Sequence, residues 1–137
     1  MADFDPKRIH KFEGTLIGHL GMRAEKLDPQ EVIFTMPVDE RTVQRFGILH
    51  GGANVALAET VASVGATLHI DLNTHYAVGL EINANHLRAV SSGQVRAVGT
   101  PIHVGRRTQI WEIKIYNDEN KLSCISRCTM SVNPKAT

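Results

Sequence analysis

One carboxylate stands out in the stretch GILHGGANVALAETVAS, which spans residues 47–63. Glu59 is the only acidic residue in this largely apolar segment. With about 100° per residue on a helical wheel, it is surrounded mostly by small side chains. Those neighbours are Gly52, Val55, Ala56, Ala62, Ser63 and Ala66. Because a buried carboxylate without a partner is costly, the pattern indicates a functional role. The alternative is a Glu59 that lies partly exposed at the helix edge, or that pairs with an arginine from a strand.

The residues His50, Gly51 and Gly52 precede this segment at the expected start of the helix. Glycines there allow a ligand to approach the backbone N–H groups, which have no partner inside the helix. The helix dipole favours negative charge at the same end. The pattern therefore indicates an oxyanion hole, which stabilises charge developing on a carbonyl oxygen. A plain glycine turn is the alternative, but the histidine, the two glycines and the downstream glutamate are more specific together.

A third candidate is the stretch HVGRRT, residues 103–108. It places a glycine and two arginines at an expected junction between strands. Guanidinium groups bind phosphate through paired, charge-assisted hydrogen bonds, so the stretch is suited to a phosphorylated ligand. A basic turn on the surface is the alternative interpretation.

The composition is that of an ordinary globular protein. The 137 residues predict one domain over residues 1–137, with 42% hydrophobic and 21% charged residues. A net charge of +1 does not indicate a surface that binds nucleic acids or membranes in general. The first residues lack the apolar core of a signal peptide, and no apolar run approaches the length of a membrane span. The expected location is cytoplasmic, with neither nucleic acid nor membrane as a partner.

Cys124 and Cys128 lie four residues apart in an expected strand. Side chains with this spacing face the same side but are roughly 13 Å apart, too far for a disulfide. A metal site would need more ligands nearby. We expect two reduced cysteines that pack as small apolar residues, which agrees with a reducing compartment.

The apolar periodicity predicts two helices and six strands. A short helix is expected over about 6–18, beginning at Asp5-Pro6, and a long helix over about 51–70. The expected strands cover residues 20–27, 30–37, 75–88, 93–104, 106–117 and 121–133. Alternation is clearest where Trp111, Ile113 and Ile115 fall on one face. The short connections predict antiparallel neighbours.

This element order predicts an α+β fold with a long central helix packed on a twisted antiparallel sheet of about six strands. Only the helix at 51–70 is long enough to cover the sheet. Opposite Glu59 its bulky side chains should bury against the sheet; they are Leu57, Val61, Val64 and Leu68. The small-residue face around Glu59 permits close approach by another helix, a second subunit or a slender ligand.

At these residues the chain resembles the hotdog-fold acyl-CoA thioesterases of the phenylacetate-pathway and 4-hydroxybenzoyl-CoA thioesterase type. The resemblance rests on MPVDERTVQRFGILHGGANVALAETVASVGA and VGLEINANHLR, and it extends from about residue 14 to 132. These stretches are most similar to the bacterial 1,4-dihydroxy-2-naphthoyl-CoA hydrolases of menaquinone synthesis. They are also similar to the paralogous enzymes that clear mischarged carrier proteins during enterobactin synthesis. The resemblance implies a hotdog fold and thioester hydrolysis.

The resemblance also implies roles for five residues. Glu59 corresponds to the catalytic carboxylate, acting as nucleophile or as general base on water. The backbone N–H of Gly51 and the side chain of Gln44 correspond to the groups that polarise the thioester carbonyl. His50 corresponds to a histidine that organises the site, and Ser63 to a hydroxyl that binds water or the carboxylate.

Contacts with coenzyme A are implied at the edge of the sheet, within residues 79–88 and 103–108. The matching residues are Gly79, Glu81, Asn83, His86, Arg88, His103, Val104, Gly105, Arg106, Arg107 and Thr108. Phe46 and Val64 are candidates to contact the acyl group. No metal or cofactor is expected, because thioester hydrolysis needs none and coenzyme A is part of the substrate.

The family implies self-association as a homodimer or homotetramer, with active sites between subunits. Benzoyl, naphthoyl, phenylacetyl and medium-chain acyl groups all remain open, on coenzyme A or on a carrier protein. One alternative is a non-catalytic hotdog protein that binds acyl-CoA, and another is a dehydratase of hydroxyacyl thioesters. Glu59, Gln44 and His50 together favour the hydrolase over the binding protein.

Overall fold

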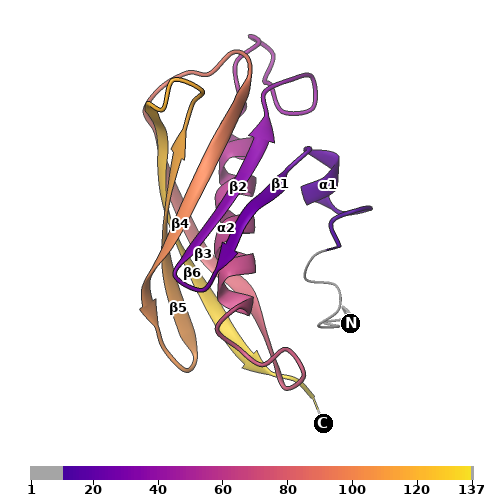
Figure 1. Ribbon diagram of the computed structural model, residues 1–137, viewed down its shortest axis with the longest axis vertical. Coiled ribbons are helices and arrows are strands. Elements are labelled where there is room, and N and C mark those ends of the chain that lie inside the picture. Colours follow the sequence, from indigo (N-terminus) through magenta and orange to yellow (C-terminus); the bar gives the residue numbers. More distant parts are fainter. Residues whose placement is uncertain (1–10, 137) are drawn as a thin grey trace.

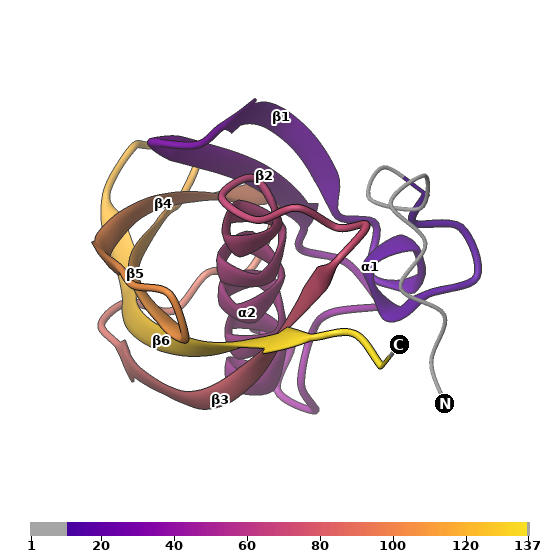
Figure 2. The ribbon, with the colours of Figure 1, turned by 90° about the horizontal axis from the view of Figure 1, so that it is seen from below.

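One long helix lies inside a curled antiparallel sheet in the computed structural model, which describes residues 11–136 (Figure 2). The elements are α1 (Leu16–His19), β1 (Arg23–Asp28), β2 (Glu31–Pro37), α2 (Gly51–Thr67), β3 (His75–His86), β4 (Gln94–Val104), β5 (Thr108–Tyr116) and β6 (Leu122–Pro134). The strands form one sheet in the order β1-β2-β4-β5-β6-β3 (Figure 1). Every neighbouring pair is antiparallel. The predicted fold class is confirmed, and each predicted strand is found within three residues of its expected bounds.

The alternation predicted for β5 sets the two faces of the sheet. Trp111, Ile113 and Ile115 are fully buried, whereas Glu112 and Lys114 on the other face are half-buried. Successive side chains of a strand point to opposite faces, so this strand presents an apolar surface to α2 and a polar one outward.

Two glycines allow α2 to lie close to the sheet. A Cβ atom at Gly65 on α2 would be 2.6 Å from Cη2 of Trp111 on β5. A Cβ atom at Gly99 on β4 would collide with the side chain of Val61. The predicted sheet-facing side chains Leu57, Val61 and Val64 are buried, while Leu68 is half-buried. Interiors are close-packed, so larger residues at either glycine would push helix and sheet apart.

The buried side of α2 is broader than predicted. Ala62 and Ala66, which the wheel placed near Glu59, are completely buried. The sheet curls around the helix instead of lying flat beneath it, so it covers more than one side (Figure 2). The face of α2 that the sheet leaves uncovered is therefore narrower than predicted.

The prediction of a helix over 6–18 is wrong for the described part of the chain. Its expected start at Asp5-Pro6 lies outside the described residues, and the helix there covers only Leu16–His19. Gly14 has a left-handed φ of 75°, which interrupts helical backbone, and the Thr15 hydroxyl caps the new start by accepting from the Gly18 N–H at 3.4 Å.

The long helix ends at Thr67, three residues earlier than predicted. The N–H groups of Leu68, His69 and Ile70 bond three residues back, to carbonyls of residues 65–67. This tighter 3₁₀-type pattern is a common way for a last turn to satisfy its carbonyls.

The expectation that consecutive strands pair is wrong for β3 and β4. β3 pairs with β6, and β4 pairs with β2. Two strands separate β3 from β4, a span of about 14 Å that the connecting residues 87–93 can cross when extended. This connection is hydrogen-bonded to the loop that precedes α2, where the Leu49 N–H donates to the Val90 carbonyl at 2.7 Å. It therefore runs past the start of α2.

The two cysteines on β6 are free and buried, as predicted. Burial raises the pKa of Cys124 to about 11. Burial, and then the negative charges of Glu59 and Glu81, raise the pKa of Cys128 to about 12. Both thiols therefore stay protonated in the folded protein at pH values where an exposed thiol ionises.

We expect the free energy of unfolding to fall as the pH rises above about 9, the ordinary thiol value. The unfolded chain releases these protons there while the folded chain keeps them, so each thiol steepens the decline by about 1.4 kcal/mol per pH unit. Urea unfolding of the wild type and of a Cys124→Ala/Cys128→Ala variant between pH 8 and 11 measures this. Equal slopes for the two proteins would contradict it.

Candidate functional site

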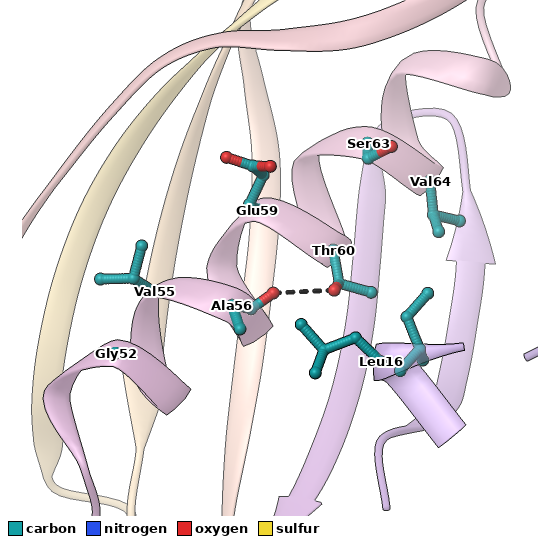
Figure 3. Close-up of a pocket in the computed structure, with 9 residues that line it drawn as sticks. Leu16, Gly52, Val55, Ala56, Glu59, Thr60, Ser63 and Val64 are labelled. Atoms are coloured by element: carbon teal, nitrogen blue, oxygen red, sulfur yellow. Dashed lines mark hydrogen bonds between the residues drawn. The ribbon is translucent and has the colours of Figure 1, made fainter. Parts of the chain in front are cut away.

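Glu59 projects from the middle of α2 into a cavity of about 420 Å³ (Figure 3). Its side chain is exposed and has no hydrogen bond or ion pair within residues 11–136. The alternative of an arginine partner is therefore wrong for a single chain, and the alternative of exposure at the helix edge is confirmed. The cavity is lined by Leu16, Ile17, Gly52, Val55, Ala56, Glu59, Thr60, Ser63 and Val64.

The carboxylate of Glu59 lies directly over Gly79 on β3. A Cβ atom at Gly79 would be 3.1 Å from Cδ of Glu59 and 3.2 Å from each carboxylate oxygen. A β-bulge interrupts the pairing of β3 with β6 between Gly79 and Glu81. Bulges re-aim side chains and are common beside functional sites. The glycine and the bulge together leave room for the carboxylate against the edge strand.

Two hydroxyl groups line the same cavity, but only one is free. The Thr60 hydroxyl donates to the carbonyl of Ala56 at 2.7 Å, so the helix backbone uses it (Figure 3). Ser63, one turn after Glu59, makes no such bond in the described part of the chain. The free hydroxyl is therefore at the predicted position.

The opposite wall of this cavity was missed by the sequence analysis. Leu16 and Ile17 on α1 line it. Figure 3 shows Leu16 across from the open face of α2. Leu16 is 60% exposed despite its size. Their position depends on how the chain before β1 folds back over α2, which local periodicity does not reveal.

His50 is the N-cap of α2. Its Nδ1 accepts from the Gly52 N–H at 2.8 Å, while its carbonyl accepts from Ala53 and Asn54. Within residues 11–136 no hydrogen-bond partner meets the N–H of Gly51, the first residue of the helix. His50 thus accepts from the N–H groups of the next residues of the helix. It leaves the N–H of Gly51, at the positive end of the helix dipole, free to bind a ligand.

Gln44 lies in the loop that leads into α2. Its side-chain oxygen accepts from the Phe46 N–H, so its Nε2 is the group left to donate. Phe46 itself is 74% exposed and stacks under the guanidinium of Arg45. The loop thereby fixes which end of the Gln44 amide is available.

Gln44 and Gly51 share a second cavity, of about 360 Å³, that does not contain Glu59. The ring of His86, at the end of β3, lies against Gly51, where a Cβ atom would be 3.0 Å from Nε2. This cavity is lined by Gln44, Ile48, Leu49, Gly51, Asn54, His86, Leu87, Arg88, Ala89 and Val90.

Asn54, which the sequence analysis missed, is the buried polar residue of this cavity. It is 5% exposed, and its Nδ2 lies 3.4 Å from Nδ1 of His86. A signal was available, because Asn54 falls on the same side of the helical wheel as Leu57 and Val61. A polar residue within a buried stripe indicates a specific partner.

The two predicted halves of the site are separate in a single chain. Gly51 and Glu59 are eight residues apart on one helix, a distance of about 12 Å along its axis. A single carbonyl group cannot contact both. Glu59, Ser63 and Val64 therefore line one cavity, and Gln44, Gly51, His86 and Arg88 the other.

The arginines of the turn between β4 and β5 line neither of these two cavities. Arg106 and Arg107 line a cavity of about 400 Å³ with His75, at the opposite end of β3 from His86. His103, Val104 and Thr108 are exposed around the same turn, where the Gly105 N–H donates to the Thr108 carbonyl at 2.8 Å. Glu81 and Asn83 are exposed on β3, where the Asn83 amide donates to Glu81 at 3.3 Å. One chain alone does not unite the stretches expected to bind coenzyme A.

Within residues 11–136, no three His, Cys, Asp or Glu side chains gather closely enough to hold a metal ion. None of the helices described is long and apolar enough to cross a membrane.

The model of the thioesterase superfamily matches residues 46–124 of this chain. Among relatives, 1,4-dihydroxy-2-naphthoyl-CoA hydrolase of Escherichia coli is 46% identical over 120 residues, covering 88% of each chain. Proofreading thioesterase EntH of Cronobacter turicensis is 49% identical over 119 residues, covering 87% of this chain and 86% of its own.

Solved structures agree with the fold. A variant of thioesterase PA1618 from Pseudomonas aeruginosa superposes with a TM-score of 0.90 at 45% identity, covering 96% of this chain and 95% of its own. Two variants of the Staphylococcus aureus protein SAV0944 have also been solved. One has a glutamate replaced by alanine and the other a glutamine, and the two positions are fifteen residues apart. Those structures have TM-scores of 0.86 and 0.85 at 38% identity. The glutamate variant covers 88% of this chain and 99% of its own, and the glutamine variant 87% and 98%.

Proposed function

Because the chain belongs to the thioesterase superfamily, the hotdog-fold enzymes, we propose that it hydrolyses aryl- or acyl-CoA thioesters to the free acid and coenzyme A. The observation that carries this proposal is the unpaired carboxylate of Glu59, held over Gly79 in a cavity with no other charged residue in its lining. A carboxylate that is paired neither to a cation nor to a donor is free to act on a substrate.

Glu59 attacks the carbonyl carbon directly, or takes a proton from a water molecule that attacks it. Direct attack gives a mixed anhydride, which water then hydrolyses. In both routes the C–S bond breaks and coenzyme A leaves as a thiolate. A thiol pKa of about 8.5 makes this a good leaving group, so no strong general acid is required. Neither a metal nor a cofactor takes part.

The Gly51 N–H and the Gln44 Nε2 donate to the carbonyl oxygen as it gains negative charge. Two observations support this assignment: the cap that leaves the Gly51 N–H free, and the Phe46 bond that uses Oε1 and leaves Nε2 to donate. Gln44 and Glu59 are also fifteen residues apart, the spacing of the residues exchanged in SAV0944. His50 acts through its cap, and Ser63 binds the attacking water or the carboxylate.

A complete site needs a second copy of the chain, because one carbonyl cannot reach both Gly51 and Glu59 in the same helix. We propose that two copies pair through β3, an edge of the sheet on which Val78 and Leu80 are exposed. Edge strands are ready templates for pairing, and a two-fold axis would set the Glu59 cavity of one copy against the Gly51 cavity of its partner. Further pairing of such dimers gives the tetramer expected for the family.

The same pairing bears on coenzyme A. The ends of β3 marked by His75 and His86 are about 36 Å apart, so the Arg106 cavity is remote from Gly51 in one chain. An antiparallel partner strand reverses this, and brings one copy's arginines toward the other copy's His86 and Arg88. We assign the phosphates of coenzyme A to Arg106 and Arg107 on this basis.

For the acyl group we propose an aromatic ring, on the model of the relative that hydrolyses 1,4-dihydroxy-2-naphthoyl-CoA. That substrate would place the protein in menaquinone biosynthesis. The apolar side chains around Glu59, including Leu16 and Val64, suit such a ring. The relative named as a proofreading thioesterase supports a second candidate, an acyl group on a carrier protein. The two free cysteines agree with a cytoplasmic location.

The proposal is tested by measuring thiol release from benzoyl-, 1,4-dihydroxy-2-naphthoyl-, phenylacetyl- and octanoyl-CoA, and from a benzoylated carrier protein. We expect the aryl-CoA compounds to turn over fastest. Preference for the carrier protein would favour the proofreading role. Tight binding of coenzyme A with no turnover of any thioester would instead establish the non-catalytic binding protein.

Replacing Gly79 with alanine is expected to lower kcat by about 10- to 100-fold, because the new methyl group displaces the Glu59 carboxylate. Light scattering checks that the variant still pairs, since Gly79 lies on the strand proposed to join the two copies. Asn85→Ala, at an exposed position on the same strand, serves as the control. A Gly79→Ala protein with wild-type kcat would show that the position of the carboxylate is not critical.

A further inference from the structure

The side-chain amide of Asn54 is buried, and one of its two polar atoms has no hydrogen-bond partner in the described part of the chain. Its side chain is 5% exposed, and its Oδ1 is buried with no hydrogen-bond partner in the described part of the chain. Buried polar groups are nearly always satisfied, so an orphaned carbonyl oxygen in a helix against the core calls for an explanation. The other half of the amide supplies one, because Nδ2 lies 3.4 Å from Nδ1 of His86.

This contact links the orientation of the Asn54 amide to the position of the proton on His86. An amide nitrogen only donates, so an Asn54 amide that presents Nδ2 to the ring requires the Nδ1 of a neutral His86 to accept and its proton to reside on Nε2. The reverse orientation of the amide would present Oδ1 to the ring and require the proton on Nδ1. The orientation of Asn54 and the tautomer of His86 are therefore linked.

The other ring nitrogen of His86 lies beside Gly51, the residue whose N–H is free. His86 Nε2 would be 3.0 Å from a Cβ atom on Gly51, and no hydrogen bond is made by Nε2 within residues 11–136. Gln44, Gly51, Asn54 and His86 line one cavity of about 360 Å³. The donors of Gln44 and Gly51 thus have a third donor next to them.

We propose that Asn54 is a positioning residue that holds His86 in the Nε2–H tautomer, so that His86 donates to the same carbonyl oxygen as Gly51 and Gln44. The catalytic part of this inference rests on the proposed function, whereas the tautomer does not. An orphaned Oδ1 is then the consequence of dedicating the amide to donation. With Nδ1–H instead, a lone pair of Nε2 would face the oxygen and oppose its developing charge.

The first experiment reads the tautomer directly from the nitrogen-15 signals of the imidazole at pH 8.5, where an ordinary histidine is neutral. His86→Gln identifies which signals belong to His86. We expect Nε2–H in the wild type and Nδ1–H in Asn54→Asp, whose carboxylate has the same shape but can only accept. An Nδ1–H tautomer in the wild type would overturn the proposal without any variant at position 54.

The second experiment measures kcat and KM with benzoyl-CoA. Asn54→Asp should lower kcat about tenfold or more with little change in KM, because the lost donor acts mainly in the transition state. Asn54→Ala, which removes the contact and leaves both tautomers of His86 available, should lower kcat less than Asn54→Asp. Asn54→Asp should cost nothing further in a His86→Ala protein. Equal losses in both backgrounds would show that Asn54 does not act through His86.

The outcomes separate the two proposals. A wild type that hydrolyses no thioester overturns the proposed function and the donor role of His86, while the nitrogen signals still decide the tautomer. A wild type with normal hydrolysis, and an Asn54→Asp protein with unchanged signals and kcat, overturns the positioning role alone.

Discussion

Replacing Glu59 with glutamine is expected to lower kcat for an aryl-CoA substrate by about 10³-fold or more. The amide has nearly the same size and can occupy the same space over Gly79, but it is neither a nucleophile nor a base. The charge lost is not part of any ion pair within residues 11–136, so the fold should not depend on it. Initial rates of thiol release at saturating substrate measure the effect.

A matched control is available on the other face of the sheet. Glu112 is half-buried on β5, next to Lys114 at 3.7 Å. Glu112→Gln should leave kcat within about twofold of the wild type, since surface ion pairs of this kind contribute little. Circular dichroism spectra of both variants establish that they are folded. Full activity in a folded Glu59→Gln protein would exclude this residue as nucleophile or base.

Two inactive proteins are expected to restore each other when their subunits mix. Glu59→Gln removes the carboxylate from one side of the proposed shared site, and Gln44→Ala removes a donor from the other. In a mixed dimer both defects fall in one site and the second site is intact. Equal amounts, unfolded and refolded together, should recover about a quarter of the wild-type activity, because half of the dimers are mixed and each has one good site.

The control for this experiment is a mixture of Glu59→Gln with Glu59→Ala. Every site in this mixture lacks its Glu59 carboxylate, and no activity should return. If Glu59→Gln and Gln44→Ala also fail to complement, although light scattering shows mixed dimers, each site is built from one chain. The separation of about 12 Å along α2 would then have to be bridged by movement within the chain.

Local patterns were sufficient to predict much of the fold. The small and apolar run at about 51–70 predicted α2, and the alternation of Trp111, Ile113 and Ile115 predicted which face of β5 is buried. These features have periods of 3.6 and 2 residues, so a short window of sequence contains them. The pairing of β3 with β6 has no such period, because it depends on where a connection crosses the sheet.

The candidate site shows the same limit. Glu59 and Gly51 were predicted because they belong to one short motif, but their assignment to two cavities follows from the length of the helix between them. The contact between Asn54 and His86 joins residues 32 positions apart, and Leu16 lines the Glu59 cavity from a different helix. Such relationships arise from tertiary packing, and the periodicity of one segment does not contain them.

The His50 cap links local stability to activity. The same side chain that caps α2 also leaves the Gly51 amide free, so the proposed carbonyl site depends on the first helical turn being formed. Helix ends open at much lower free energy than the core, and without loss of the remaining structure. Fraying of this one turn therefore removes the binding geometry from a protein whose sheet and helix are otherwise intact. For the proposed site, we therefore expect local opening of this turn to limit activity before global unfolding of the domain does.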